Sequence, residues 1–415
     1  MTRIQAAFLQ LMQNVLCGSS FGDEYKLTEQ EWQNILQLSD EQKVLPLVLE
    51  TASKTIKPGD KKFLSFRGKA YITVTRQIIQ TNEFLTLLLH AQSQGLDPIV
   101  LKGIICRELY EKPFLRLSVD EDLLVSPEQL EAFHCFLLNE GLYSDNPVED
   151  DTRQVAATTE LSYHKENSPT YIELQKTIFD PDSAVFGRFN ELFPNLSDHT
   201  MRVQIEDVSV CTLESGYHLL YLILHVFKHF VYSGVGIRPL CDIGLFAQHY
   251  ADEIDWNWLR DSLEKVGVFY YARALFRIIQ LHLMPNAPFY DRIEDWELSA
   301  VDVEPLLEDM LASGLHGASS MMRLHSSNMT LEAVKAKRLR KRSVLSTVFP
   351  PLTNMRSRYP YLKKAPFLLP VAWAQRILHY LKETHRSSRG TVSESAESIR
   401  LGRERVKLLE KYHII

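Results

Sequence analysis

The sequence predicts an α+β protein that is predominantly helical, with N- and C-terminal helices wrapped around one small mixed sheet. Helical periodicity dominates residues 61–94 and 216–283. Between them, Ile99–Leu101 and Leu117–Val125 are short apolar runs typical of buried strands. Glycine contributes only 17 of the 415 residues, well below the typical ~7%. This scarcity disfavours an all-β protein with many glycine turns.

Composition places the chain among ordinary globular proteins. It is 45% hydrophobic and 24% charged, with a formal net charge of -6. These values exclude the disordered, collagenous and disulfide-scaffold classes and disfavour a general nucleic-acid binder. At ~150 residues per domain, the length corresponds to two or three domains. The pattern predicts a helical N-terminal region, an α/β core, a helical domain and a basic C-terminal region with an amphipathic helix, at residues 1–94, 95–180, 181–330 and 331–415, respectively.

Cysteine usage predicts a reducing compartment. The five cysteines are odd in number and widely spaced in apolar surroundings, and the lack of a CxxC pair disfavours a structural zinc. Met1–Cys17 predicts an amphipathic helix, because Gln5 and Gln10 interrupt the apolar run that a signal peptide requires. No stretch reaches the ~18–20 apolar residues that span a bilayer. We therefore expect a cytoplasmic protein without a transmembrane segment.

Strands and helices alternate in the predicted α/β core. After the first strand, Lys102-Gly103 turns the chain into a helix expected over Ile104–Tyr110. The second strand is followed by Ser126-Pro127-Glu128, which has a capping hydroxyl, a proline at the first helical position and an acid in the first turn. This pattern predicts a second helix, ending near Glu140.

The strongest chemical signal is the acidic motif Asp120-Glu121-Asp122 in the second predicted strand. Because side chains alternate along a strand, Asp120 and Asp122 are expected on one face, about 6.6 Å apart after two ~3.3 Å rises. Ionised carboxylates at that distance repel by roughly 2.5 kcal/mol at an effective dielectric near 20. A magnesium or manganese ion between them converts this cost into binding. Acidic pairs at strand ends also occur without a metal, so the tripeptide alone leaves a structural role open.

Two neighbouring features favour a phosphate and metal site. Lys102-Gly103 ends the preceding strand, where the lysine supplies positive charge and the glycine allows a phosphate to approach backbone N–H groups. Val155–Tyr163 and Thr170–Gln175 predict a hairpin, whose second strand carries Glu173. Three carboxylates beside a glycine turn form the layout of two-metal phosphoryl transfer.

The order of these motifs resembles a known family. Similarity to the bacterial family of uncharacterised nucleotidyltransferases, a branch of the DNA polymerase β-like superfamily, is carried by Leu101-Lys102-Gly103, Leu109-Tyr110, Arg116 and Asp120–Val125. Segments at residues 225–229, 236–242 and 349–373 are similar to the same family, in the same order.

This resemblance implies an activity and a set of roles. A nucleoside monophosphate would be transferred from an NTP, expected to be ATP, to an acceptor, with release of pyrophosphate, and residues 95–180 would be the catalytic core. Asp120 and Asp122 would bind Mg²⁺ or Mn²⁺ and the NTP phosphates. Glu173 would complete the metal site and help to activate the acceptor hydroxyl. Lys102 and Gly103 would lie against the triphosphate.

Three positions depart from the pattern of the wider superfamily and sustain a second hypothesis. Ile104 follows the glycine where the superfamily usually has serine, and Glu121 stands between the aspartates where an apolar residue is common. Glu173 replaces the commoner aspartate. The alternative is therefore a non-catalytic binding protein that keeps the nucleotidyltransferase fold and uses its basic C-terminal segment to hold an anionic partner, either nucleic acid or a membrane surface.

Four cationic or imidazole side chains leave more than one interpretation open. Arg116 either neutralises phosphate or pairs with the acidic strand. Arg238 either faces the nucleotide or acceptor, or pairs with Asp242 four residues later on one helix. His225 and His229 have the i, i+4 spacing of metal ligands, but their apolar neighbours and the missing third ligand favour histidines of a core or pocket wall.

Positive charge is concentrated in the C-terminal region. Residues 335–364 contain ten Lys or Arg and no acid, with Tyr359 and Tyr361 among them. Such a segment suits nucleic acid, an anionic lipid surface or a phosphorylated acceptor. The amphipathic segment Phe367–Leu381 suits a membrane surface. The alternative is a solvated basic helix followed by a helix docked on the acidic body of the protein.

Overall fold

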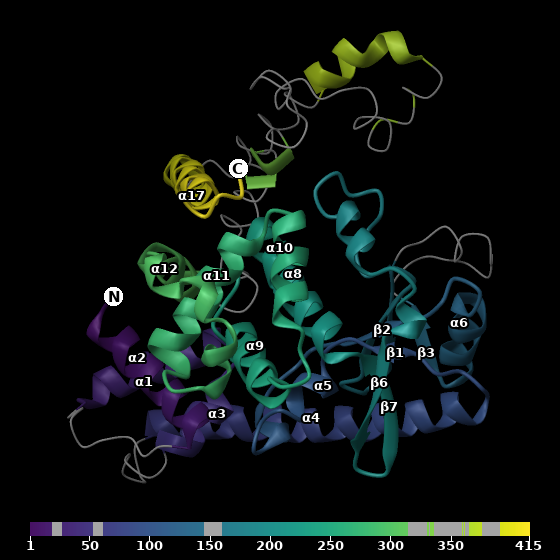
Figure 1. The fold of residues 1–415 in the computed structure, drawn as a ribbon, viewed down its shortest axis with the longest axis horizontal. Coiled ribbons are helices and arrows are strands. Elements are labelled where there is room, and N and C mark those ends of the chain that lie inside the picture. Colours follow the sequence, from purple (N-terminus) through teal and green to yellow (C-terminus); the bar gives the residue numbers. More distant parts are fainter. Residues whose placement is uncertain are drawn as a thin grey trace. The chain divides into compact units, whose positions relative to one another are not determined.

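The structure of the protein is a computed structural model (Figure 1), which describes residues 1–18, 27–52, 61–144, 160–313, 330–331, 333–335, 359, 361, 365–375 and 391–415. It confirms an α+β fold that is predominantly helical, with a small mixed sheet. The chain forms two compact units. The larger comprises Met1–Phe230 and Gly234–Gly317, and the smaller comprises Val231–Ser233 and Ala318–Ile415. The division into four regions along the chain stays a prediction.

The central sheet has five strands in the order β1-β2-β5-β4-β3. Their bounds are β1 (Ile99–Val100), β2 (Glu121–Leu124), β3 (Leu142–Ser144), β4 (Glu160–Lys165) and β5 (Tyr171–Gln175). β2 pairs in parallel with β5, and the other neighbouring strands pair antiparallel. In the parallel pair, Asp122 lies opposite Glu173. The register of the sheet therefore brings two of the predicted metal ligands side by side.

β2 is shorter than the predicted strand Leu117–Val125, because side chains take the backbone hydrogen bonds of its first residues. Gln77 Oε1 accepts a hydrogen bond from the Ser118 N–H at 2.6 Å. Gln80 Nε2 donates to the Val119 carbonyl at 3.1 Å. As a result, the first aspartate of the acidic motif precedes β2 and the second lies within it.

The helices of the core also begin and end differently from the prediction. α5 (Ile104–Arg107) ends early, because the Tyr110 N–H donates to the Arg107 carbonyl in a turn. α6 (Leu130–Asn139) begins after the predicted cap at Ser126, since the Gln129 N–H donates to the Ser126 carbonyl and closes a turn first. β4 begins within the first predicted hairpin strand, and residues 155–159 lie outside the described residues.

A second sheet is the two-stranded hairpin of β6 (Thr200–Ile205) and β7 (Val208–Leu213). It lies in the region expected to be helical, and we did not predict it, although apolar Met201, Val203 and Ile205 alternate with polar residues in β6. The Thr212 hydroxyl donates to the Val100 carbonyl at 2.6 Å. His218 Nδ1, 3.1 Å from the same hydroxyl oxygen, is left to donate to it. This chain of hydrogen bonds joins β7 and α8 (Ser215–Tyr232) to β1.

Helices precede and follow the strand-rich segment along the chain. The N-terminal helices are α1 (Arg3–Cys17), α2 (Glu29–Glu41) and α3 (Leu45–Ala52), followed by the long α4 (Lys61–Ser93). The predicted amphipathic helix is confirmed as α1, which begins with a capping box of Thr2 and Gln5. α4 contacts α2, α3 and β7, and Figure 1 shows it passing from the N-terminal helices to the sheets.

The helices that follow β7 complete the larger unit. They are α8, α9 (Arg238–His249), α10 (Trp256–Lys265), α11 (Phe269–Ile278) with the π-helix η4 (Ile279–Leu283), and α12 (Glu304–Ser313). Gln42, at the end of α2, joins two of these helices, α9 and α12, to α2. Its Oε1 accepts from the Ile237 N–H at 2.8 Å, and its Nε2 donates to the Met310 and Leu311 carbonyls at 3.1 Å. This buried amide fixes the start of α9.

The smaller unit includes the 3-10 helix η9 (Pro366–Leu368) and α17 (Thr391–Lys411). Apart from Lys335, Tyr359 and Tyr361, the predicted basic segment lies outside the described residues. Residues 376–381 of the predicted amphipathic segment also lie outside them. Phe367, 80% exposed, belongs to its described part. The anionic partner stays a prediction.

Buried His218 is expected to make stability depend on pH. Burial lowers the pKa of His218 to about 3. Because the unfolded chain takes up this proton near pH 6.5 and the folded chain does not, stability falls as the pH drops below about 6.5. Between about pH 7.5 and 5.5, the expected loss is about 1.4 kcal/mol. Urea unfolding of the wild type and His218→Gln at both values measures it; the wild type should lose more, and equal losses would contradict the assignment.

Candidate metal and nucleotide site

Three carboxylates converge at the edge where β2 and β5 run side by side. One oxygen each from Asp120, Asp122 and Glu173 lies within 4.8 Å of the other two. Asp122 is fully buried, and the other two residues are partly buried. At an effective dielectric near 20, two ionised groups 4.8 Å apart repel by about 3.5 kcal/mol. We call these three residues the acidic triad; it brings together the carboxylates that the sequence selected.

Lys102 supplies the nearest positive charge. Its Nζ lies 3.2 Å from Asp120 Oδ2 and 3.1 Å from Asp122 Oδ2. The lysine follows β1 directly, and the antiparallel pairing of β1 with β2 places it beside the acidic motif. At the same effective dielectric, each contact contributes about 5 kcal/mol of attraction. Lys102 therefore offsets much of the repulsion within the acidic triad.

Burial and the positive charge of Lys102 shift the pKa values of the triad carboxyl groups in opposite directions. Burial opposes ionisation of Asp120, but the Lys102 ammonium lowers its pKa below the ordinary value. Burial raises the pKa of Asp122 well above the usual range, against the effect of Lys102. Burial and the charge of Asp120 raise the pKa of Glu173. The site thus favours one carboxylate–ammonium pair, and a further cation among these oxygens would favour ionisation of the other two groups.

Glu121, the unusual middle residue of the acidic motif, faces away from the triad. Its Oε1 lies 2.6 Å from Arg107 Nη1, and both side chains are buried. Its Oε2 accepts a hydrogen bond from the Ile104 N–H at 2.8 Å. Glu121 therefore stabilises the turn between β1 and α5 by a buried ion pair and a charge-assisted hydrogen bond.

Gly103 is required by this turn. It has a φ of +67°, and a Cβ atom there would lie 2.0 Å from Glu121 Oε2. The neighbouring Ile104 N–H, a potential phosphate donor, is used by Glu121. The structure thus gives Gly103 a packing role, and its contact with a triphosphate stays a prediction.

Arg116 belongs to a different buried ion pair. Its Nη2 lies 2.6 Å from Asp242 Oδ2, and its Nε donates to Asp242 Oδ1 at 3.2 Å. The Tyr110 hydroxyl donates to Asp242 Oδ1 at 2.8 Å. Arg116 therefore pairs with α9 rather than with the acidic strand. The bidentate contact joins α9 to the loop before β2.

Arg238 lies at the start of α9, buried and close enough to Asp120 for each charge to affect the other. Its guanidinium donates to the Leu117 carbonyl. Burial and the nearby charge of Arg116 lower the pKa of Arg238 to about 10. Arg238 thus adds positive charge beside the triad and fixes the loop that carries Asp120, while Asp242 is used by Arg116.

Tyr221, His225 and His229 follow one another at i, i+4 spacing on α8 and reach Lys102 through His225; we call them the α8 stripe. His225 Nε2 lies 3.4 Å from Lys102 Nζ and 2.9 Å from His229 Nε2, and its Nδ1 lies 3.4 Å from the Tyr221 hydroxyl. Since an ammonium only donates, His225 Nε2 is the acceptor in its contact with Lys102, and its Nδ1 then carries the proton. Both histidines are half-buried, and the expectation that they belong to a core or a pocket wall stays a prediction. Sequence reasoning missed Tyr221, although the i, i+4 spacing of the three residues was available.

A sequence profile of a family described as uncharacterised nucleotidyltransferase matches residues 28–283, more than half of the chain. The chain belongs to this nucleotidyltransferase family. The match extends from α2 to η4 and includes the acidic triad, Lys102 and the α8 stripe. Comparisons with curated proteins and with solved structures found no match. Among the described residues, every helix is too short or too polar to span a bilayer.

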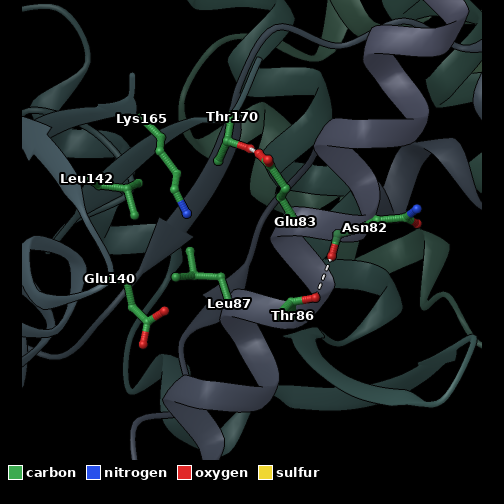
Figure 2. Close-up of a pocket in the computed structure, with 8 residues that line it drawn as sticks. All are labelled: Asn82, Glu83, Thr86, Leu87, Glu140, Leu142, Lys165 and Thr170. Atoms are coloured by element: carbon green, nitrogen blue, oxygen red, sulfur yellow. Dashed lines mark hydrogen bonds between the residues drawn. The ribbon is translucent and has the colours of Figure 1, made fainter. Parts of the chain in front are cut away.

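The larger unit also has a cavity of about 220 Å³ whose lining does not include the triad (Figure 2). Its lining comes from α4, from the chain around β3 and from the hairpin of β4 and β5; the residues are Asn82, Glu83, Thr86, Leu87, Glu140, Leu142, Lys165 and Thr170. Figure 2 shows Glu83 directed at Thr170, which donates a hydrogen bond to it. No member of the triad lines this cavity.

Substitution of Gly103 is expected to be far more costly than that of a glycine in open space. Gly103→Ala meets Glu121 and adopts an unfavourable φ, so a loss of more than about 2 kcal/mol is expected. Gly95, with a φ of +76° and no atom within 4 Å of a built Cβ, is the control; Gly95→Ala should lose about 1 kcal/mol. Urea unfolding of both variants measures the difference, and equal losses would refute the packing role.

Proposed function

We propose that the protein is a metal-dependent nucleotidyltransferase that transfers a nucleoside monophosphate from an NTP, with ATP as the expected donor, to an acceptor hydroxyl. Membership of the nucleotidyltransferase family supports the reaction class. The convergence of Asp120, Asp122 and Glu173 within 4.8 Å carries the proposal, because this donor set suits a divalent cation. The two-metal chemistry of the polymerase β-like superfamily is the mechanism that we propose for it.

Mg²⁺ is the cation that this donor set fits best, with Mn²⁺ as a close substitute. All three ligands are carboxylates, and hard oxygen donors favour these ions over zinc. The only cluster of three or more metal-ligating side chains in the described part of the chain is this triad. When bound, the metal neutralises charge on the phosphates and on the attacking and leaving oxygens.

Each residue of the site has a role in the proposed reaction. Asp120 and Asp122 would hold the metal. Glu173 accepts the proton of the acceptor hydroxyl, whose oxygen forms a bond to the α-phosphorus as the bond to the pyrophosphate oxygen breaks. Lys102 and Arg238 provide positive charge beside the phosphates, and Gly103 contributes backbone next to them. Arg116, by contrast, acts through Asp242 and supports α9.

The cysteines bear on the cellular location. All five are free thiols, which supports the proposed cytoplasmic location.

Glu121 motivated the hypothesis of a non-catalytic binding protein. Its pairing with Arg107 on the opposite side of β2 supports a structural explanation for this residue instead.

Loss of a triad carboxylate is expected to abolish transfer. Asp120→Asn and Glu173→Gln should each lower Mg²⁺-dependent transfer of label from α-labelled ATP by roughly 100-fold or more, about 2.7 kcal/mol of transition-state stabilisation. Transfer from γ-labelled ATP should be absent, because the γ-phosphate leaves in pyrophosphate. Glu128→Gln removes a carboxylate outside the triad and should behave as wild type. Full transfer by folded Asp120→Asn would refute the proposed site.

A further inference from the structure

The proposed metal site already contains a cation of the protein's own. The Lys102 ammonium lies 3.1–3.2 Å from oxygens of Asp120 and Asp122, and its side chain is only 14% exposed. Mg²⁺ approaches carboxylate oxygens to about 2.0–2.1 Å. A metal that uses these oxygens would therefore meet a second positive charge a few ångströms away. Occupation of the site by the metal and by the ammonium are competing states.

Lys102 can move, whereas the backbone beside it is fixed. The Leu101 N–H donates to the Asp122 carbonyl at 3.0 Å, and the Ile104 N–H donates to Glu121 at 2.8 Å. The four-carbon stem of lysine has several rotatable bonds, so the ammonium can leave the aspartates without a shift of β1. Arg238, in contrast, is buried and hydrogen-bonded to the Leu117 carbonyl.

His225 on α8 determines the side of the site on which Lys102 can find another partner. His225 Nε2 lies 3.4 Å from its Nζ and accepts from it. A neutral imidazole does not replace the negative charge of two aspartates. A displaced ammonium therefore needs an anion on the side of the site that His225 faces, and a triphosphate has the matching chemistry.

We propose that Lys102 is an exchangeable counter-ion that couples metal binding to nucleotide binding. The inference rests on the proposed function. Without nucleotide, Lys102 holds Asp120 and Asp122 and the metal binds weakly. When the metal and the nucleotide bind together, the metal takes the aspartates and the triphosphate takes the ammonium.

Two binding measurements on the full chain test this proposal without any turnover. The first is the affinity for Mn²⁺ alone, followed by the electron paramagnetic resonance signal of free Mn²⁺. Lys102→Met should bind Mn²⁺ at least tenfold more tightly than the wild type, a difference of about 1.4 kcal/mol. The second is the affinity for a non-hydrolysable ATP analogue at saturating Mn²⁺, measured by calorimetry. Here Lys102→Met should bind at least tenfold more weakly.

The opposite signs of the two effects distinguish a counter-ion from a structural residue, whose loss would weaken both affinities. Lys69→Met is the matched control, since Lys69 pairs with Asp40. Its two affinities should equal those of the wild type. Lys102→Gln, which keeps a polar group beside the aspartates, is measured in parallel and decides the test if Lys102→Met does not fold.

Each remaining outcome has a defined meaning. Equal Mn²⁺ affinities in the wild type and the folded Lys102 variants, or weakening of both affinities, would overturn the counter-ion role and leave the proposed metal site intact. Absence of Mn²⁺ binding by the wild type and by all variants, even with the ATP analogue, would instead overturn the proposed function.

Discussion

Mutual repulsion among three carboxylates is the constraint on which the rest of the site depends. Asp120, Asp122 and Glu173 are held within 4.8 Å of one another, although ionised groups at this distance repel. The parallel register of β2 and β5 enforces the approach, and Lys102 offsets its electrostatic cost. A fold that keeps such a cluster despite its destabilising repulsion is typical of a site where a cation is part of the function.

One face of β2 contributes to the acidic triad, and the other face stabilises the fold. Asp122 points toward Asp120 and Glu173, whereas its neighbour Glu121 points the other way and joins Arg107 and the Ile104 N–H. This alternation explains how a third acid can stand inside the acidic motif without adding to the repulsion. The arginines divide in the same way. Arg116 and its partner in α9 hold the loop before β2, whereas Arg238 places its charge beside the triad.

Much of the fold and of the site could be predicted from local pattern, and the rest depends on contacts between distant residues. The fold class, the mixed sheet and the grouping of the triad follow from alternation and motif order. The late start of β2, at Glu121, could not be foreseen, because Gln77 and Gln80 of α4 bind the backbone of the residues before it. The partner of Arg116 lies 126 residues away in the sequence. The β6–β7 hairpin, in contrast, had a readable alternation that we did not use.

The central claim is that the acidic triad is a metal site, and a crystal structure with Mn²⁺ and a non-hydrolysable ATP analogue tests it most directly. The account predicts an anomalous Mn²⁺ peak within about 2.3 Å of oxygens from Asp120, Asp122 and Glu173, bridging to the triphosphate. A triad with no anomalous peak, or Glu173 turned away from a metal bound elsewhere, would contradict it.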